Sequence, residues 1–303
     1  MSADLRVAAG EYLEQRRARG YKLRDEGALL ERFVNTLHAT GADRITVADA
    51  VAFAQRGPEV SRATHAWRLG AIRAFASWLR AVDQAAAEEI PPGLIRGGYQ
   101  RVNPFLYSSA QVDQLMAAAR SIPERWLADA MYILIGLLHV TGLRSGEALR
   151  VDVEDLDSPG LVLTVRGKLD RQRLVPVHPS TAAELRAYCD GRTSGPLLVG
   201  RTGQRLARNA AHAGFRRVVA TAALAPQQGA GPPRLHAFRH TLAVDALVDA
   251  HRRGLDVDAR IAVVSTFLGH KDPLNTYWYL TASPELMSAV SDRMAATLRR
   301  RTR

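Results

Sequence analysis

Helical periodicity recurs through the first hundred residues and is interrupted only by short polar breaks. Apolar residues return at helical spacing in four segments: Leu5 to Arg19, Glu26 to Thr40, Val47 to Arg56 and Ala63 to Val82. This pattern predicts four helices and no sheet, which makes an all-helical amino-terminal domain.

Composition changes at Pro91-Pro92-Gly93, and Gly97, Gly98 and Pro104 follow within a short distance. Proline and glycine at this density are typical of a linker between domains. We therefore predict two domains, residues 1–98 and residues 99–303. Two domains are also the usual number for a chain of 303 residues.

The second part of the chain is also mainly helical by its pattern. Ser108 and Gln111 predict the capped start of a helix, and Trp126 to Val140 is apolar enough for a buried central helix. The exception is Leu161 to Val177, where the β-rich segments LVLTV and RLVPV flank a short polar run and predict a hairpin. The predicted fold class is mainly α, with an all-helical amino-terminal domain and a mainly helical second domain that contains a small antiparallel β-sheet.

The chain is strongly basic, with 41 Lys and Arg against 30 Asp and Glu and a formal net charge of +11. Such an excess favours an anionic polymer as partner, with nucleic acid ahead of an acidic membrane surface. The longest mostly apolar run, Ala128 to Val140, is too short to cross a bilayer, so we expect a soluble protein with no membrane role.

The cellular compartment is indicated by cysteine usage and by the amino terminus. Cys189 is the only cysteine, which excludes an intrachain disulfide and a multi-cysteine zinc site and favours the reducing cytoplasm. The opening MSADLRVAAG lacks the basic and then apolar pattern of a secretion signal, so no export is expected.

The segment Ala63 to Val82 combines apolar and basic positions. Four large residues at roughly helical spacing predict a stripe that faces the core: Trp67, Ile72, Phe75 and Trp78. Arginines occupy other positions: Arg62, Arg68, Arg73 and Arg80. Two interpretations of these arginines stay open, a surface that faces nucleic-acid phosphates and a solvated helix face.

A Thr141-Gly142 turn directly follows the predicted central helix and places Arg144 near the start of the next helix. The guanidinium carries a fixed charge and forked donors, and the amides of a helix start add partial positive charge, so this position favours anions. An arginine at a helix start is also commonly paired with a nearby carboxylate. Both interpretations stay open.

His236 and Arg239 stand three residues apart and share one helical face, so a proton carrier and a fixed cation can meet the same phosphate. A histidine with a pKa of roughly 6.5 exchanges protons near neutrality, which suits a general acid or base. Arg144 and Arg239 together would stabilise the extra negative charge of a pentavalent transition state. A surface ion-pair cluster is the alternative interpretation of His236 and Arg239.

Two further residues are candidates for contact with the same phosphate. Lys168 lies on or next to the predicted hairpin turn and is a candidate general acid for a departing 5′ oxygen, with a solvated turn lysine as the alternative. Leu268-Gly269 predicts a helix stop that fixes His270 at the edge of a cleft, where its imidazole can donate to a phosphate oxygen. A core histidine bonded to a carbonyl is the alternative for His270.

Tyr279 is the candidate nucleophile, because a phenol can attack phosphorus directly and keep the bond energy as a phosphotyrosine without a nucleotide cofactor. Tyr277 is its rival, and side-chain chemistry alone does not choose between them. Metal-assisted cleavage needs clustered carboxylates or histidines. The densest acidic group is interpreted as a solvated turn and strand edge, so neither a metal nor a cofactor is assigned: Asp152, Glu154, Asp155 and Asp157.

Taken in chain order, these motifs resemble those of the tyrosine recombinases, also called phage-type integrases, over roughly residues 104 to 295. The matching motifs are TGLRSGEAL, RGKLDRQRLVPV, HAFRHTLAV and LGHKDPLNTYWYL. By its spacing from His270, the resemblance selects Tyr279 over Tyr277. Two departures are Phe238, where leucine is more usual, and the long stretch Val244 to Thr266, which suggests two helices with a longer connection.

The resemblance implies a site-specific DNA recombinase that acts as an integrase, resolvase-like or transposase-like protein of a mobile element. Residues 1–98 would be a helical core-binding domain that completes a clamp around double-stranded DNA, and residues 99–303 the catalytic domain. Cleavage would give a 3′-phosphotyrosine, and strands would exchange through a Holliday junction within a homotetramer, in the cytoplasm at the nucleoid.

The same resemblance implies a role for each motif residue: Arg144, Arg239 and His270 as phosphate stabilisers, His236 as general acid or base, Lys168 as general acid for the leaving group, Tyr279 as nucleophile and Glu147 as the supporting carboxylate. A DNA-binding protein that kept the fold without catalysis is the alternative function. A type IB topoisomerase is disfavoured by the separate clamp domain and the motif spacing.

Overall fold

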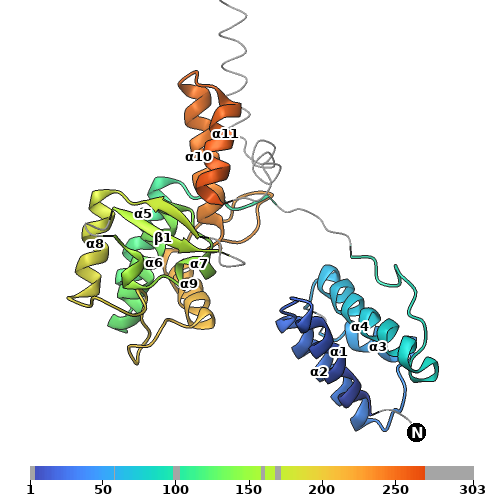
Figure 1. Ribbon diagram of the computed structural model, residues 1–303. Helices are drawn as coiled ribbons and strands as arrows, with labels where there is room; N and C mark the ends of the chain where they lie inside the picture. Colours follow the sequence, from blue (N-terminus) through green and yellow to red (C-terminus); the bar gives the residue numbers. More distant parts are fainter. Residues whose placement is uncertain (1–3, 58, 98–102, 158–160, 168–171, 270–303) are drawn as a thin grey trace, which may run out of the picture. The chain divides into compact units, whose positions relative to one another are not determined.

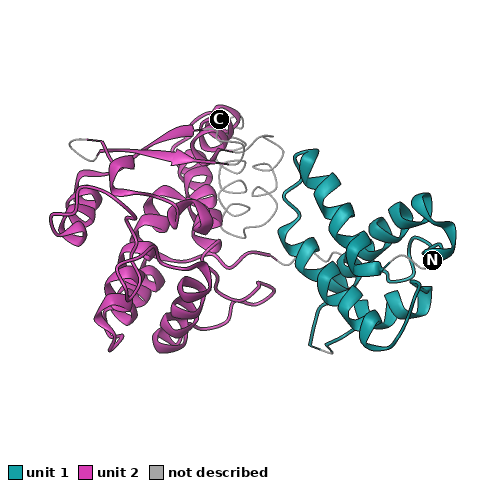
Figure 2. Cartoon of the chain, turned by 60° about the horizontal axis from the view of Figure 1, so that its bottom comes forward, with its two compact units in different colours: residues 1–101 teal, residues 102–303 magenta. Residues whose placement is uncertain are grey.

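The computed structural model describes residues 4–57, 59–97, 103–157, 161–167 and 172–269. The chain divides into two compact units, Met1–Arg101 and Val102–Arg303 (Figure 2). The predicted fold class, mainly α with a small antiparallel sheet, is confirmed. Among the described residues, no helix combines the length and the apolar character needed to cross a membrane.

In the described part of the amino-terminal unit, every regular element is a helix (Figure 1). Its elements are α1 (Leu5–Ala18), α2 (Arg24–Ala39), α3 (Val47–Ala54), α4 (Arg62–Val82) and the short 3-10 helix η1 (Gln84–Ala86). Local signals fix the helix starts, since Thr46 and Ser61 each accept a hydrogen bond from a backbone N–H of the first turn. The four predicted helices are therefore confirmed, with small differences at their ends.

The core of this unit gathers around α4. Ile72 and Phe75 are fully buried, and Phe75 packs against Tyr12 with ring centroids 5.5 Å apart. The prediction for Trp67 is wrong, because this side chain is 41% exposed. It stands five residues before Ile72, which at 3.6 residues per turn is roughly 140° around the helix from the buried stripe.

Two of the α4 arginines bind groups within the amino-terminal unit. Arg68 donates to the carbonyls of Ala54 and Arg56, at 3.3 and 2.6 Å, and so satisfies the end of α3. Arg80 pairs with Glu89 at 3.7 Å. Some of the α4 arginines therefore stabilise the fold of this unit. Neither a surface that faces phosphates nor a solvated helix face, the two interpretations of the sequence, includes this role.

The second unit packs its elements around the buried helix α6. The helices among its described residues are α5 (Ser109–Arg120), α6 (Arg125–Thr141), α7 (Ser145–Ala148), η2 (Val153–Asp155), α8 (Pro179–Cys189), α9 (Arg208–Ala222), α10 (Ala237–Arg252) and α11 (Val257–Leu268). Ser108 and Gln111 form the predicted capping box of α5. Met131, Leu134 and Leu138 of α6 are fully buried, as the apolar run predicts.

The predicted hairpin is confirmed as β1 (Val162–Arg166) and β2 (Gln172–Pro176), which pair antiparallel. Leu163 pairs with Val175, and both are fully buried on the face that packs on the core. Two pairs further along, and so on the same face, buried Val165 lies opposite Arg173. The pleat therefore puts an arginine on the inner face of the sheet.

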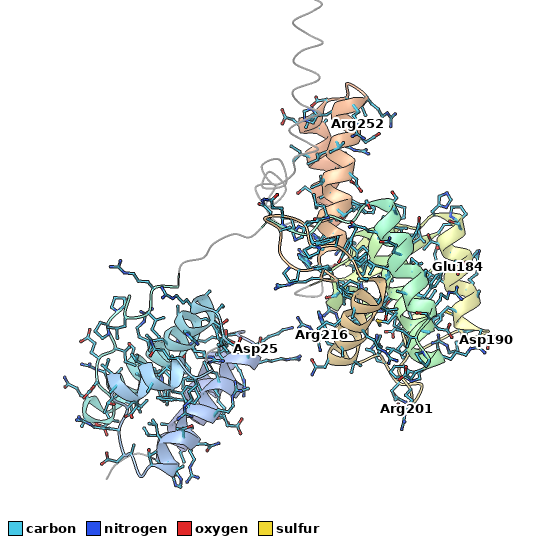
Figure 3. The ribbon with its side chains drawn as sticks, turned by 180° about the vertical axis from the view of Figure 1, so that it is seen from behind. Asp25, Glu184, Asp190, Arg201, Arg216 and Arg252 are labelled. Carbon is cyan, nitrogen blue, oxygen red and sulfur yellow. The ribbon has the colours of Figure 1, made fainter. Side chains whose placement is uncertain are left out.

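Helices α10 and α11 lie side by side (Figure 1) and share a small apolar cluster that includes Val244, Leu247 and Ile261. Arg252, at the end of α10, lies at the tip of this pair (Figure 3). The two helices are as predicted, but the longer connection is not. The link is the short segment Arg253 to Asp256, since Gly254 adopts a φ of 69° and turns the chain sharply.

Candidate active site

The end of α6 fixes the place of Arg144. Gly142 caps this helix in the left-handed region, at a φ of 57°, and its N–H donates to the carbonyl of Leu138. Leu143 is buried, and Arg144 then becomes the N-cap residue of α7. The predicted turn and helix start are confirmed, and the Arg144 side chain keeps 44% of its surface exposed.

Gly142→Ala is expected to destabilise the protein by about 1–3 kcal/mol. A Cβ on Gly142 would lie 2.7 Å from Cδ2 of Leu268, and alanine is strained at this φ. Urea unfolding of both proteins measures the difference. Gly146→Ala is a suitable control, because the nearest atom to its Cβ, Nη1 of Arg150, is 3.8 Å away. Equal effects of the two changes would contradict the close packing at Gly142.

Glu147 is the partner of Arg144. Its buried carboxylate accepts from the Arg144 backbone N–H at 3.0 Å and from Nη1 at 2.8 Å. The open question about Arg144 thus has a structural answer, since a nearby carboxylate does pair with it. The pair also sets the direction of the half-exposed guanidinium, which is the geometric role that the resemblance implies for Glu147.

Arg173 is a site residue that the sequence did not single out. From β2 it donates to both carboxylate oxygens of Glu147, at 2.8 Å from Nη2 and 3.3 Å from Nη1. A signal was available, because alternation with buried Val175 places position 173 on the inner face of the strand. A charged residue on a buried face requires a partner.

The environment of Glu147 strongly favours its ionised form. Burial by itself raises the pKa of this carboxyl, but the hydrogen bonds and charges of Arg173 and Arg144 outweigh it and lower the pKa to about 2. In the unfolded chain the pKa of Glu147 is near 4.5, so this carboxyl becomes protonated as the pH falls below that value. In the folded protein it stays ionised down to a pH of about 2. The contribution of Glu147 to the free energy of unfolding is therefore complete above pH 4.5 and is lost as the pH falls toward 2.

The comparison of wild type with Glu147→Gln tests this pH dependence. The glutamine does not titrate, so the difference in unfolding free energy between the two proteins should be constant above the unfolded pKa and shrink by about 3 kcal/mol as the pH falls from 4.5 to 2. Urea unfolding at a series of pH values measures it. A difference that does not change across this range would contradict the lowered pKa of Glu147.

Arg239 lies in the first turn of α10 and is only 1% exposed. Its guanidinium donates to the carbonyl of Gly142 at 3.0 Å and to that of Leu268 at 2.6 Å. These carbonyls belong to the carboxyl ends of α6 and α11, where the helix dipole favours a cation. Arg239 therefore ties the turn before Arg144 to the helix end that precedes His270.

His236 is the N-cap residue of α10 and lies near the charges of Arg239 and Arg144. The pKa of its imidazole is lowered, first by desolvation from the protein atoms around the ring and then by the charges of Arg239 and Arg144, against an opposing effect of Glu147. The residue still exposes part of its surface. A neutral imidazole at neutral pH can accept a proton.

Two members of the acidic group after α7, Glu154 and Asp157, are exposed as the sequence predicts, but the other two pair with arginines. Asp155 is buried, accepts from Arg166 at 2.6 Å and caps the backbone N–H of Asp152. Asp152 also pairs with Arg205 at 2.6 Å. Arginines neutralise these two carboxylates, and within the described part of the chain no cluster of His, Cys, Asp or Glu has the makings of a metal site.

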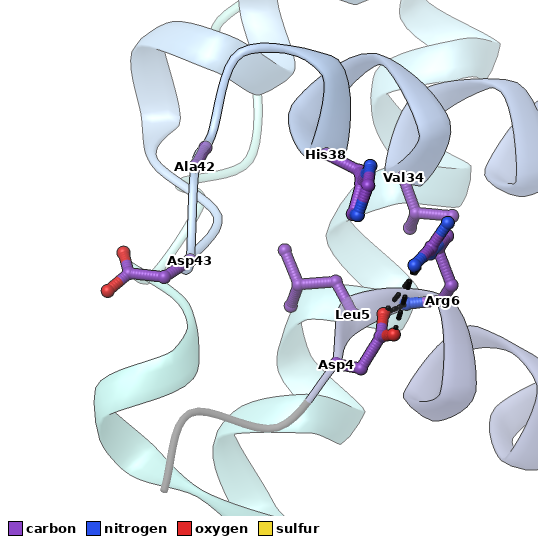
Figure 4. A pocket seen from close by; sticks show the side chains of 7 residues that line it. All are labelled: Asp4, Leu5, Arg6, Val34, His38, Ala42 and Asp43. Carbon is purple, nitrogen blue, oxygen red and sulfur yellow. Dashed lines mark hydrogen bonds and ion pairs between the residues drawn. The ribbon is translucent and has the colours of Figure 1, made fainter.

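A small pocket at the start of α1 lies in the amino-terminal unit (Figure 4). Two of its charged groups are paired with each other, since the Asp4 carboxylate accepts from the backbone and side chain of Arg6. The side chains that line it are those of Asp4, Leu5, Arg6, Val34, His38, Ala42 and Asp43. None of the predicted site residues is among them.

The model of the phage integrase family matches residues 106–285, which is more than half of the chain and includes every predicted site residue. The chain belongs to the phage integrase family. Two curated relatives agree. The protein y4rB of Sinorhizobium fredii, named as an integrase/recombinase, is 37% identical over 95% of this chain and 96% of its own length. The tyrosine recombinase XerC of Mycobacterium leprae is 31% identical over 78% of each chain.

The fold of this phage integrase is also found among solved structures. A lambda integrase tetramer bound to a Holliday junction has a TM-score of 0.59 at 17% identity, over 88% of this chain and 77% of that one. At such identity the likeness concerns the fold alone.

The structure of this phage integrase brings together four of the predicted residues and leaves three untested. Arg144, Glu147, His236 and Arg239 meet around the ends of α6 and α11, from segments far apart in the sequence. The other three predicted site residues lie outside the described residues: Lys168, His270 and Tyr279. Gly269 ends α11 at a φ of 68°, so the predicted helix stop before His270 is confirmed.

Proposed function

We propose that this phage integrase is a site-specific DNA recombinase that cleaves a DNA phosphodiester with Tyr279 as the nucleophile and without a metal ion. The observation that supports the proposal best is the gathering of Arg144, Arg239 and the buried Glu147 carboxylate near His236. With Arg173 included, three guanidinium charges against one carboxylate leave two net positive charges, which suits a phosphate in a pentavalent transition state.

The proposed reaction balances without a cofactor. The Tyr279 phenol oxygen forms a bond to phosphorus while the bond from phosphorus to O5′ breaks, which yields a 3′-phosphotyrosine and a free 5′ hydroxyl. The phenol proton passes to His236, whose lowered pKa keeps its imidazole neutral and able to accept it. Lys168 gives a proton to the departing O5′. His270 and the arginines stabilise the phosphate oxygens.

We further propose that the enzyme works as a homotetramer on double-stranded DNA and exchanges strands through a Holliday junction. The basic chain supports DNA as the partner, and the lambda integrase relative of the same fold is a tetramer on such a junction. The amino-terminal unit would serve as the core-binding domain and the second unit as the catalytic domain. Arg62 and Trp67 of α4, both exposed, are candidates for contact with DNA.

Covalent capture tests this function. The wild-type protein is incubated with a pool of nicked duplexes of random sequence, in which cleavage near the nick releases a short strand and traps the enzyme. Captured duplexes are recovered, amplified and sequenced. We expect a denaturant-resistant adduct joined through the 3′ end of the cut strand, on duplexes that share one sequence, in buffer with a metal chelator. Sequence-specific binding without any adduct would support the inactive DNA-binding protein instead.

A further inference from the structure

Arg173 holds a central place in the candidate site that none of the predicted roles covers. It reaches the site from the inner face of β2, opposite Val165, and its side chain is 17% exposed against 44% for Arg144. Both of its terminal nitrogens donate to Glu147. Arg173 is therefore the more enclosed of the two arginines that share this carboxylate.

The fork of Arg173 fixes the plane of the Glu147 carboxylate. Each carboxylate oxygen receives one donor from Arg173 and one from Arg144, so a rotation of the carboxylate out of this plane would break hydrogen bonds to both arginines. Arg144 is held by Glu147 alone among its described side-chain contacts. A rotation of the Glu147 carboxylate would consequently shift the half-exposed guanidinium of Arg144.

Arg173 also packs against the end of α11. A Cβ built on Gly269 would lie 3.1 Å from its Cδ and Nη1 and 3.2 Å from its Cζ, so the glycine leaves the room that this side chain fills. Gly269 directly precedes His270 in the chain. Arg173 thus joins three parts of the site, namely β2, the start of α7 and the end of α11.

We propose that Arg173 is a positioning residue for DNA cleavage, which fixes Glu147 and through it sets the guanidinium of Arg144 against the scissile phosphate. This inference rests on the proposed function. A forked donor is required for the role, because lysine supplies the same charge but cannot hold both carboxylate oxygens in one plane.

The test compares variants in single-turnover adduct formation on one nicked duplex recovered by covalent capture with wild type. Arg173→Met is expected to slow cleavage about 10²-fold through misplacement of Arg144. Arg173→Lys should fold and remain slow. Glu147→Gln combined with Arg173→Met should be no slower than the slower single variant, because both act through one contact. Arg205→Met is the control, since Arg205 pairs with Asp152 and carbonyls after α7 without touching Glu147.

A second substrate separates positioning from a loss of structure. The same duplex is made with a neutral methylphosphonate at the cleavage position, which has less need of the Arg144 charge. We expect the deficit of Arg173→Met and Arg173→Lys to shrink on this substrate, whereas a variant that is merely misfolded would be equally slow on both. Tyr279→Phe versions of the variants should bind the duplex as tightly as Tyr279→Phe alone.

The outcomes for the two proposals are distinct. If wild type forms no adduct with any duplex of the pool, the proposed function fails and Arg173 is not the cause. If wild type forms the adduct and Arg173→Met cleaves at the wild-type rate, the positioning role is wrong. Full activity of Arg173→Lys, or an equal deficit on both substrates, would also overturn it.

Discussion

Tyr279→Phe is expected to abolish covalent attachment to DNA, with a loss of more than about 10⁴-fold in the cleavage rate. The change removes the single oxygen that the proposed reaction joins to phosphorus and leaves the aromatic ring in place. Binding of the duplex should persist, because arginines and other basic groups, rather than the phenol, supply the attraction to phosphates. Adduct formation and duplex affinity are measured on the same protein.

Tyr277→Phe is the matched control, since it removes the same atom two residues earlier in the chain. It should cleave at close to the wild-type rate. The reverse result, in which Tyr277→Phe is inactive and Tyr279→Phe still forms the adduct, would move the nucleophile to Tyr277. If both variants still form the adduct, neither tyrosine is the nucleophile.

Arg239→Met should have the largest combined effect on stability and cleavage. The Arg239 guanidinium is buried and donates to the carbonyls of Gly142 and Leu268. Each hydrogen bond from a charged donor contributes about 1.5–3 kcal/mol, so we expect a loss of roughly 3 kcal/mol after allowance for the burial cost of the charge. Cleavage by the remaining folded protein should fall about 10²–10³-fold, because a preorganised donor is removed.

Arg217→Met is the control for this change. Arg217 pairs with Glu124 at 2.8 Å, but both side chains are half-exposed, and such a surface pair adds little to stability. Urea unfolding gives the stabilities, and single-turnover cleavage at a temperature where all variants are folded gives the rates. If Arg239→Met were as stable and as fast as Arg217→Met, Arg239 would be neither a structural tie nor a phosphate stabiliser.

The parts of the fold that depend on local signals could be predicted from the sequence. The Thr141-Gly142 turn and the stop at Gly269 were predictable because each places glycine in the left-handed region at a helix end. The hairpin followed from two β-rich runs around a polar turn. Trp67 was misplaced because its spacing from Ile72 only approximates the helical period.

The contacts that shape the candidate site depend on distant segments and could not be predicted in the same way. Arg239 reaches carbonyls 97 and 29 residues away. Arg173 meets Glu147 across 26 residues, so its role becomes visible only when the register of the hairpin is known. The sequence indicates a solvated Asp155, because no local pattern predicts its ion pair with Arg166. The order of the motifs was enough to predict the candidate site residues, but their hydrogen-bond partners depend on tertiary packing.

Identification of the residue that carries the DNA tests the central claim most directly. The captured wild-type adduct is digested with trypsin and nuclease, and the modified peptide is fragmented in a mass spectrometer. Fragmentation is needed because the peptide from Asp272 to Arg293 contains both Tyr277 and Tyr279. The account predicts one nucleotide joined through its 3′ phosphate to Tyr279. A nucleotide on any other residue, or one joined through its 5′ phosphate, would contradict it.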